Sequence, residues 1–328
     1  MPRIPDAVSK LSIAAIKPTA VGLLTHVPGF CRLITRTGGT DNPRYCYSVW
    51  LRHLVTVNDH HLLVGVPPRV AEIGPGDSIG IGLAALLSGV RQYSAIDIAR
   101  LANSERNLSI LRQLITLFKE RAAIPDEREF PLVSPRLESY QFPASLVTDA
   151  MLESSLSEAR IQAIADAVTT ATTSDAPSRP IITYVAPWTK IDILPAASFD
   201  LIYSQAVLEH VDQLDQMYAA MHAWLKPGGV MSHDIDFSHH RIGPLWNSHW
   251  SYSRRVWRLI RGRRAWLLNR QPHSRHLEII RRSGFELVAD VSTRRTVGLK
   301  RSDLASEFAD MSDDDLVTSE SYVLAIKR

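Results

Sequence analysis

The feature that most constrains this chain is an apolar segment ending in a glycine turn, Val70-Ala71-Glu72-Ile73-Gly74-Pro75-Gly76. The segment has the pattern of a buried strand, and Gly74 and Gly76 allow a tight turn because they lack a Cβ. Residues 79–88 continue as an apolar helix whose first N–H groups would face that turn. The sequence therefore predicts a strand, a turn and a helix that together form a polar cradle.

An acidic residue ends the next predicted strand. Residues 92–97 have the pattern of a strand, and Asp97 follows Gly76 by 21 residues. That spacing is close to the one expected for a carboxylate that binds the hydroxyls of a ribose. The two oxygens of Asp97 can accept both vicinal hydroxyls at once, through charge-assisted hydrogen bonds.

The glycine pattern departs from that of dinucleotide-binding proteins. Those proteins need a third glycine where the helix and the pyrophosphate crowd the backbone, whereas this chain has Ser78 and a displaced Gly80. The chain also lacks a convincing Tyr-x-x-x-Lys pair. These departures disfavour an NAD-dependent oxidoreductase or epimerase.

Two later segments extend the pattern. Residues 198–211, SFDLIYSQAVLEHV, indicate a strand and a turn, and residues 225–231, LKPGGVM, indicate a helix end, a turn and another strand. With the Glu-x-Gly-x-Gly motif, these segments resemble the class I S-adenosylmethionine-dependent methyltransferases over residues 69–240. The resemblance implies an α/β fold: a Rossmann-like, seven-stranded, mostly parallel sheet with helices on both faces. We expect an N-terminal helical extension over residues 1–66, a methyltransferase domain over residues 67–328, and a helical insertion over about residues 121–179.

The resemblance also implies a cofactor site for S-adenosyl-L-methionine. In it, Asp97 would hold the ribose, Ser204 and Gln205 would lie near the methionine part and the acceptor, and Ala186 would offer backbone groups to the adenine. Trp188 fits stacking on the adenine and ordinary packing equally well. The full set of predicted cofactor residues is Glu72, Gly74, Pro75, Gly76, Asp97, Ile98, Ala186, Ser204 and Gln205.

A His/Asp-rich stretch, residues 232–240, follows the fifth predicted strand. Ligands of open α/β sheets bind beyond the carboxyl ends of the strands, so we expect a loop here that faces the methyl acceptor. His233 and Asp236 are the candidate catalytic residues if the acceptor must lose a proton, and His210 is a further candidate. His233, Asp236, His239 and His240 could also bind a metal, but their spacing fits no familiar metal motif, so we predict no metal.

Residues 246–266 are rich in Trp and Arg. The pattern suits a helix with Trp inward and Arg in water, and it also suits a surface for anionic rings, nucleic acid or lipid. We favour the structural interpretation. Together with the His/Asp stretch, the segment loosely resembles methyltransferases associated with glycans or other small molecules.

Composition restricts the setting. The chain has 328 residues, 45% of them hydrophobic, and a net charge of +3, which is too small to imply nucleic acid by itself. Cys31 and Cys46 are too few for a disulfide framework, and no apolar run is long enough to span a membrane. We therefore expect a cytoplasmic enzyme of undefined oligomeric state that methylates a small molecule, such as a sugar or a glycan precursor. The alternatives are a catalytically silent cofactor-binding scaffold and a nucleic-acid methyltransferase.

Overall fold

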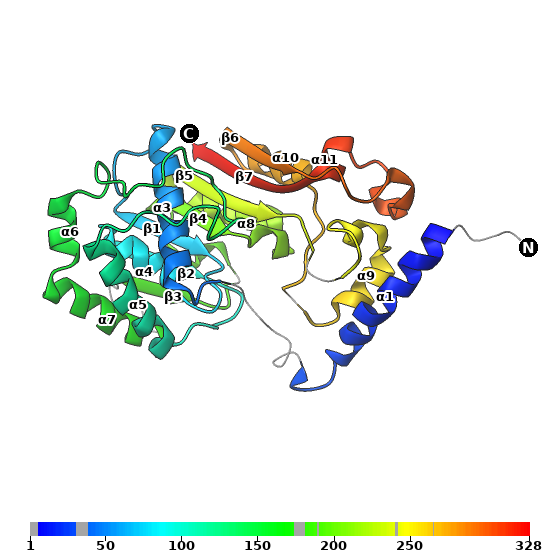
Figure 1. Ribbon diagram of the computed structural model, residues 1–328, viewed down its shortest axis with the longest axis horizontal. Helices are drawn as coiled ribbons and strands as arrows, with labels where there is room; N and C mark the ends of the chain where they lie inside the picture. The colour runs from blue at the N-terminus through cyan, green and yellow to red at the C-terminus, as the bar shows by residue number, and fades with distance from the viewer. Residues whose placement is uncertain (1–5, 31–38, 174–180, 189, 240–241, 265) are drawn as a thin grey trace, which may run out of the picture.

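The computed structural model describes residues 6–30, 39–173, 181–188, 190–239, 242–264 and 266–328. Its core is a seven-stranded sheet in the order β3-β2-β1-β4-β5-β7-β6 (Figure 1). The strands are β1 (Arg69–Ile73), β2 (Gln92–Ile96), β3 (Ile182–Val185), β4 (Phe199–Gln205), β5 (Leu225–Asp236), β6 (Phe285–Arg294) and β7 (Thr318–Lys327). All neighbours from β3 to β5 are parallel, whereas β7 is antiparallel to β5 and β6. The predicted seven-stranded, mostly parallel sheet is confirmed.

Helices cover both faces of this sheet. One face packs against α3 (Pro43–Asp59), α4 (Gly80–Leu87), α5 (Ser104–Lys119), α6 (Asp149–Ser155) and α7 (Glu158–Thr173). The other packs against α8 (Leu214–Trp224) and α10 (His273–Arg282). The remaining α-helices are α1 (Asp6–Leu24), α9 (Arg254–Arg261) and α11 (Asp313–Val317), and the short helices are η1 (Ile191–Ile193), η2 (Leu208–His210), η3 (Ser248–Ser251), η4 (Arg301–Asp303) and η5 (Ser306–Phe308). No helix in the described part of the chain is long and apolar enough to cross a bilayer.

In the described part of residues 1–66, the predicted N-terminal extension, two α-helices have different roles. Helix α3 belongs to the main core, because its fully buried Trp50 and Leu51 pack in the same apolar cluster as strands β1 and β2. Asn42 caps the helix by accepting hydrogen bonds from Arg44 and Tyr45. Helix α1 instead lies beside α9 at one end of the molecule (Figure 1), where Gly22 allows the two backbones to meet.

The Trp/Arg-rich segment adopts the structural arrangement that we favoured. Trp250 and Trp257 are buried, whereas the side chains of Arg254, Arg255 and Arg258 face solvent. Helix α9 therefore presents its aromatic side to the protein and its basic side to water.

The inserted region is held against α3 by one buried arginine. Arg52 is fully buried, and its guanidinium donates to the carbonyls of Pro125, Val133 and Pro135 at 2.9, 2.6 and 3.2 Å. It also pairs with Glu127 at 3.1 Å. Because three of these partners are backbone oxygens, Arg52 fixes the path of the chain between residues 125 and 135. Within the predicted insertion, the helices α6 and α7 are separated by Leu156 and Ser157.

Candidate active site

Strand order places the candidate site where the chain reverses its direction of winding across the sheet. Strands β2 and β3 lie on one side of β1, and β4 and β5 lie on the other. Ligands of open α/β sheets bind beyond the carboxyl ends of the strands at such a switch point. Gly74 and Val207 meet there, because a Cβ on Gly74 would lie 2.5 Å from a methyl carbon of Val207.

The glycine turn, residues 74–78, contacts the acid at the end of β2. Gly74 and Gly76 have φ values of +68° and +70°, which are strained for residues with a Cβ. The Gly76 N–H points to Asp97 Oδ2 at 3.3 Å, and Ile98 donates its N–H to Asp97 Oδ1 at 2.6 Å. The tips of β1 and β2 are therefore close enough to hold one ligand.

Glu72 supports this turn from beneath. Its side chain is buried, and Oε2 accepts hydrogen bonds from the hydroxyls of Tyr93 and Tyr203 at 2.5 and 3.3 Å. Burial raises the pKa of Glu72 to about 8. Glu72 thus shapes the site through the two tyrosines that contact it.

The close approach of helix and sheet comes from a glycine that the sequence motif did not reveal. A Cβ on Gly82 would lie 2.1 Å from the ring of Tyr93. Ser78 accepts a hydrogen bond from the Gly80 N–H at 3.0 Å and donates to the carbonyl of Thr40. The dinucleotide-binding spacing would place its third glycine at Ile79, so the chain achieves the tight packing three positions further along, at Gly82. The signal was the Gly80-Ile81-Gly82 run.

The other predicted cofactor residues border the same edge. Ile98 is half exposed beside the largely buried Asp97. Ala186 lies at the end of β3, and the following backbone crosses the tip of β2, where the Trp188 N–H donates to the Asp97 carbonyl at 3.0 Å. Gln205 ends β4 on the other side of the switch point.

The side chains of His233 and Ser204 are neighbours on one face of the sheet. Both side chains are fully buried, and Ser204 Oγ is 2.7 Å from His233 Nδ1. Burial lowers the pKa of His233 to about 3, so the imidazole is neutral at physiological pH. The His233 side chain lies on the face of the sheet that α8 and α10 cover.

The prediction of a loop at residues 232–240 was wrong for the first half of that stretch. Strand β5 extends to Asp236, so residues 232–236 are extended and alternate between the faces of the sheet. Asp234 and Asp236 lie on the α3 face, whereas His233 lies on the opposite face. His240 lies outside the described residues.

Four carboxyl groups gather at the carboxyl ends of β4 and β5. This acid cluster consists of Glu209, Asp234, Asp236 and Glu320. Asp236 and Glu320 are direct cross-strand partners on β5 and β7. Burial is the largest cause raising the pKa of both Asp234 and Glu209 well above the ordinary range, and the other acids raise both further. His210, a predicted catalytic residue, lies beside the cluster with Nε2 3.7 Å from Glu209 Oε1.

Helix α3 and the insertion approach this cluster from above the sheet. Burial raises the pKa of Tyr45, and the charges of Asp234, Glu72 and Glu209 raise it further. The ring of Tyr45 packs edge-on against Phe130 of the insertion at 5.5 Å. Ser134 of the insertion donates a hydrogen bond to Glu320.

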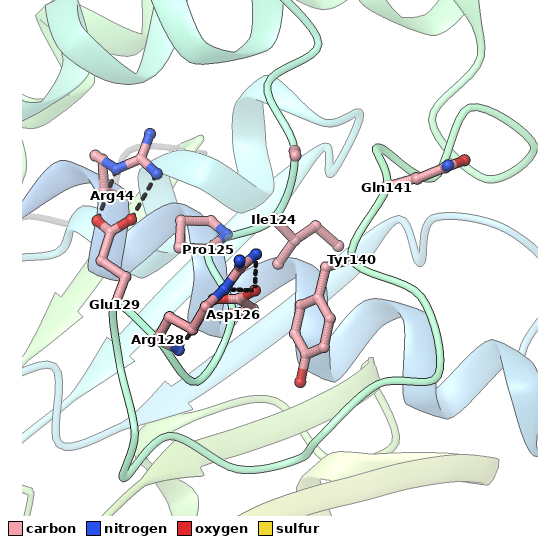
Figure 2. A pocket seen from close by; sticks show the side chains of 9 residues that line it. Arg44, Ile124, Pro125, Asp126, Arg128, Glu129, Tyr140 and Gln141 are labelled. Carbon is pink, nitrogen blue, oxygen red and sulfur yellow. Dashed lines mark hydrogen bonds and ion pairs between the residues drawn. The ribbon is translucent and has the colours of Figure 1, made fainter.

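A cavity of about 650 Å³ opens beside the same part of α3 (Figure 2). Its charged side chains pair with one another: Arg44 binds Glu129 through bonds of 2.7 and 2.6 Å, and Arg128 binds Asp126. The residues that line it are Arg44, Ala123, Ile124, Pro125, Asp126, Arg128, Glu129, Tyr140 and Gln141. Since these charges are already paired, the cavity offers a ligand less charge than the acid cluster does. Among the described residues, no three His, Cys, Asp or Glu side chains form a group that could hold a metal.

Part of the chain is similar to a known family. A family model described as "Methyltransferase domain" matches residues 148–232, which run from α6 to β5. The residues at the tips of β1 and β2 would fit S-adenosylmethionine, since Asp97 supplies a carboxylate for vicinal hydroxyls beside a turn that offers N–H groups.

The solved structures to which this chain is similar are distant in sequence. An S-adenosylmethionine-dependent methyltransferase from Mesorhizobium loti has 14% identity over 88% of this chain and 100% of its own, with a TM-score of 0.39. The phosphoethanolamine N-methyltransferase 2 of Haemonchus contortus has 14% identity over 92% of this chain and 60% of its own, with a TM-score of 0.40. No curated protein matches the chain significantly.

Proposed function

We propose that this methyltransferase methylates a small-molecule acceptor at the edge formed by the carboxyl ends of β1, β2, β4 and β5. The observation that carries the proposal is the contact of 3.3 Å between the Gly76 N–H and Asp97 Oδ2. This contact places the glycine turn and the acid within reach of one cofactor. The acid cluster lies on the same edge, beyond β4 and β5.

Each side chain has a role that its position supports. Asp97 accepts hydrogen bonds from the ribose hydroxyls, and the glycine turn lets the cofactor approach the backbone closely. Glu72, Pro75, Ile98 and Ala186 shape the surroundings. The cofactor supplies an activated methyl group on a sulfonium, so the protein's main task is to position the acceptor and exclude water. The buried polar groups at the ends of β4 and β5 suit that task.

The charge of the acceptor edge favours a small molecule over nucleic acid. The residues there are acids, which cannot attract phosphates as the Lys and Arg of nucleic-acid surfaces do. A sugar or a glycan precursor falls within the small-molecule class. The proposal includes a cytoplasmic setting, in keeping with the free, buried thiol of Cys46.

Calorimetry with S-adenosylmethionine and S-adenosylhomocysteine tests the proposal. We expect both to bind, and Asp97→Ala to weaken both by roughly 100-fold, because two charge-assisted hydrogen bonds are lost. Asp310→Ala removes an exposed acid elsewhere and serves as the matched control. Failure of both cofactors to bind would refute the proposal. Binding without turnover on any acceptor would favour the silent scaffold.

A further inference from the structure

Three members of the acid cluster come from three different elements. Glu209 lies in η2, Asp234 in β5 and Glu320 in β7. Glu320 is a hydrogen-bond partner of Asp234, and its charge also raises the pKa of Glu209. The fold therefore gathers acidic groups, and their ionised forms would repel one another in the absence of a positive partner.

Two oxygen atoms in this cluster have no hydrogen-bond partner among the described residues. They are Oδ1 of Asp234 and Oε2 of Glu209, in residues that are only 2% and 3% exposed. No described Arg or Lys forms an ion pair with Glu209, Asp234 or Glu320. Buried acids are normally satisfied by donors or by an opposite charge. These two oxygens therefore lack a donor, which a positively charged group could supply.

A chain of hydrogen bonds orients Asp234 toward that position. Tyr322 lies 2.6 Å from Ser232, which lies 2.6 Å from Nδ1 of His53. Nε2 of His53 lies 3.3 Å from Gln205 Oε1, and Gln205 Nε2 donates to Asp234 Oδ2 at 2.6 Å. Burial lowers the pKa of His53 to about 4, so its ring is neutral. Because Gln205 Oε1 can only accept a hydrogen bond, the ring carries its proton on Nε2. One oxygen of Asp234 is fixed in this way, and the other is left for a ligand.

The cluster also adjoins the proposed cofactor edge. The Ala206 N–H donates to the Asp234 carbonyl at 3.0 Å, and the next residue, Val207, contacts Gly74. A group bound at Asp234 would therefore lie beside the switch point. Ser134 of the insertion contacts the cluster through its hydrogen bond to Glu320.

We propose that Glu209, Asp234 and Glu320 form the acceptor subsite and that the acceptor is a small amine, which binds there as an ammonium ion. This inference rests on the proposed methyltransferase function and names its substrate class. An ammonium group supplies both hydrogen-bond donors and a positive charge, which no described Arg or Lys supplies to Glu209, Asp234 or Glu320. An amino sugar would combine this class with the sugar acceptors considered above.

The cluster can also take up the proton that this reaction releases. The bound ammonium gives one proton to the Asp234 carboxylate, which frees the nitrogen lone pair. The nitrogen then forms a bond to the methyl carbon as the carbon–sulfur bond breaks, and that bonding pair stays on sulfur. The products are the methylated ammonium ion and the neutral thioether of S-adenosylhomocysteine.

The test measures ligand binding to the full chain loaded with S-adenosylhomocysteine, so that no turnover occurs. Calorimetry compares two matched sets: propylamine, 1-propanol and propionate; and glucosamine, glucose and glucuronate. We expect at least one amine to bind at least tenfold more tightly than its alcohol and acid counterparts. Asp234→Asn should weaken that binding at least tenfold while S-adenosylhomocysteine affinity stays within twofold.

Two further variants make the test decisive. Glu320→Gln replaces a half-buried acid and should also weaken amine binding. It keeps the test possible if Asp234→Asn fails to fold. Asp315→Asn removes a buried carboxylate that binds Ser274 and Ser312 instead of the cluster, and it should leave amine binding unchanged.

Three results would overturn the inference. The first is amines that bind no better than their alcohols in both sets, and the second is amine affinity that neither cluster variant changes. The third is an Asp234→Asn protein with weaker affinity for S-adenosylmethionine alone, which would assign the cluster to the sulfonium. If the parent protein binds neither cofactor, the proposed function itself fails, and that outcome is distinct from all three.

Discussion

The two ends of the candidate site handle buried acids in opposite ways. At the tips of β1 and β2, both oxygens of Asp97 meet backbone N–H groups of Gly76 and Ile98. At the tips of β4 and β5, Asp234 and Glu209 each keep an oxygen without a partner and face other acids. The first end is organised by the protein alone, whereas our proposal assigns a bound cation to the second. The difference indicates which end carries specificity for the acceptor.

The largest expected effect comes from crowding the glycine-turn end. Gly82→Ala places a methyl group against the buried ring of Tyr93 and should destabilise the fold by about 3 kcal/mol, since an overfilled core cannot relax freely. Thermal unfolding measures the loss. Gly65→Ala, at an open position with a positive φ, should cost about 1 kcal/mol from backbone strain alone. Equal losses for both variants would contradict the packing role of Gly82.

The next effect concerns Glu72, which sits beneath the turn. The folded pKa of about 8 lies above the ordinary value of 4.5, so the stability linked to its proton is complete below pH 4.5 and is lost as the pH rises through 8. Glu72→Gln should reduce the loss of stability between these pH values by about 2 kcal/mol. Denaturant unfolding at several pH values measures it. If stability depends on pH in the same way in Glu72→Gln as in the parent, a group other than Glu72 is responsible for the dependence.

A smaller effect separates structural from catalytic histidines. Ser204→Ala removes the partner of the buried His233 Nδ1 and should cost about 1–2 kcal/mol of stability. Turnover measured well below the unfolding temperature should stay within roughly twofold of the parent, because His233 lies on the face opposite the acid cluster. A large loss of kcat with unchanged stability would restore His233 as a catalytic candidate.

The smallest effect has the opposite sign. The pKa of Asp234 is raised in the fold, so its stabilising contribution is lost as the pH rises through the folded value. Asp234→Asn should therefore raise the stability of the empty protein at pH 8 by about 1 kcal/mol while it impairs the acceptor site. Calorimetric unfolding measures the gain. A clear loss of stability would indicate that Asp234 is part of the structural framework.

Local patterns predicted the glycine-turn end well, and long-range pairing explains why the other end was missed. The spacing from Gly76 to Asp97 predicted a shared site, and the contact between the two is present. By contrast, Glu320 joins the cluster only through the antiparallel register that pairs it with Asp236. No local pattern encodes that register. Strand alternation was the one available signal, because Asp234 and Asp236 share a face from which His233 is excluded.

The way Arg52 holds the insertion has a consequence for changing what the enzyme accepts. Its guanidinium donates hydrogen bonds to backbone carbonyl groups, which every residue type provides. Side chains between residues 125 and 135 can therefore be replaced while the backbone keeps its path. That stretch includes Phe130 and Ser134, which reach Tyr45 and Glu320. Libraries that vary this loop around an unaltered Arg52 would therefore remodel the wall nearest the substrate on a fixed scaffold.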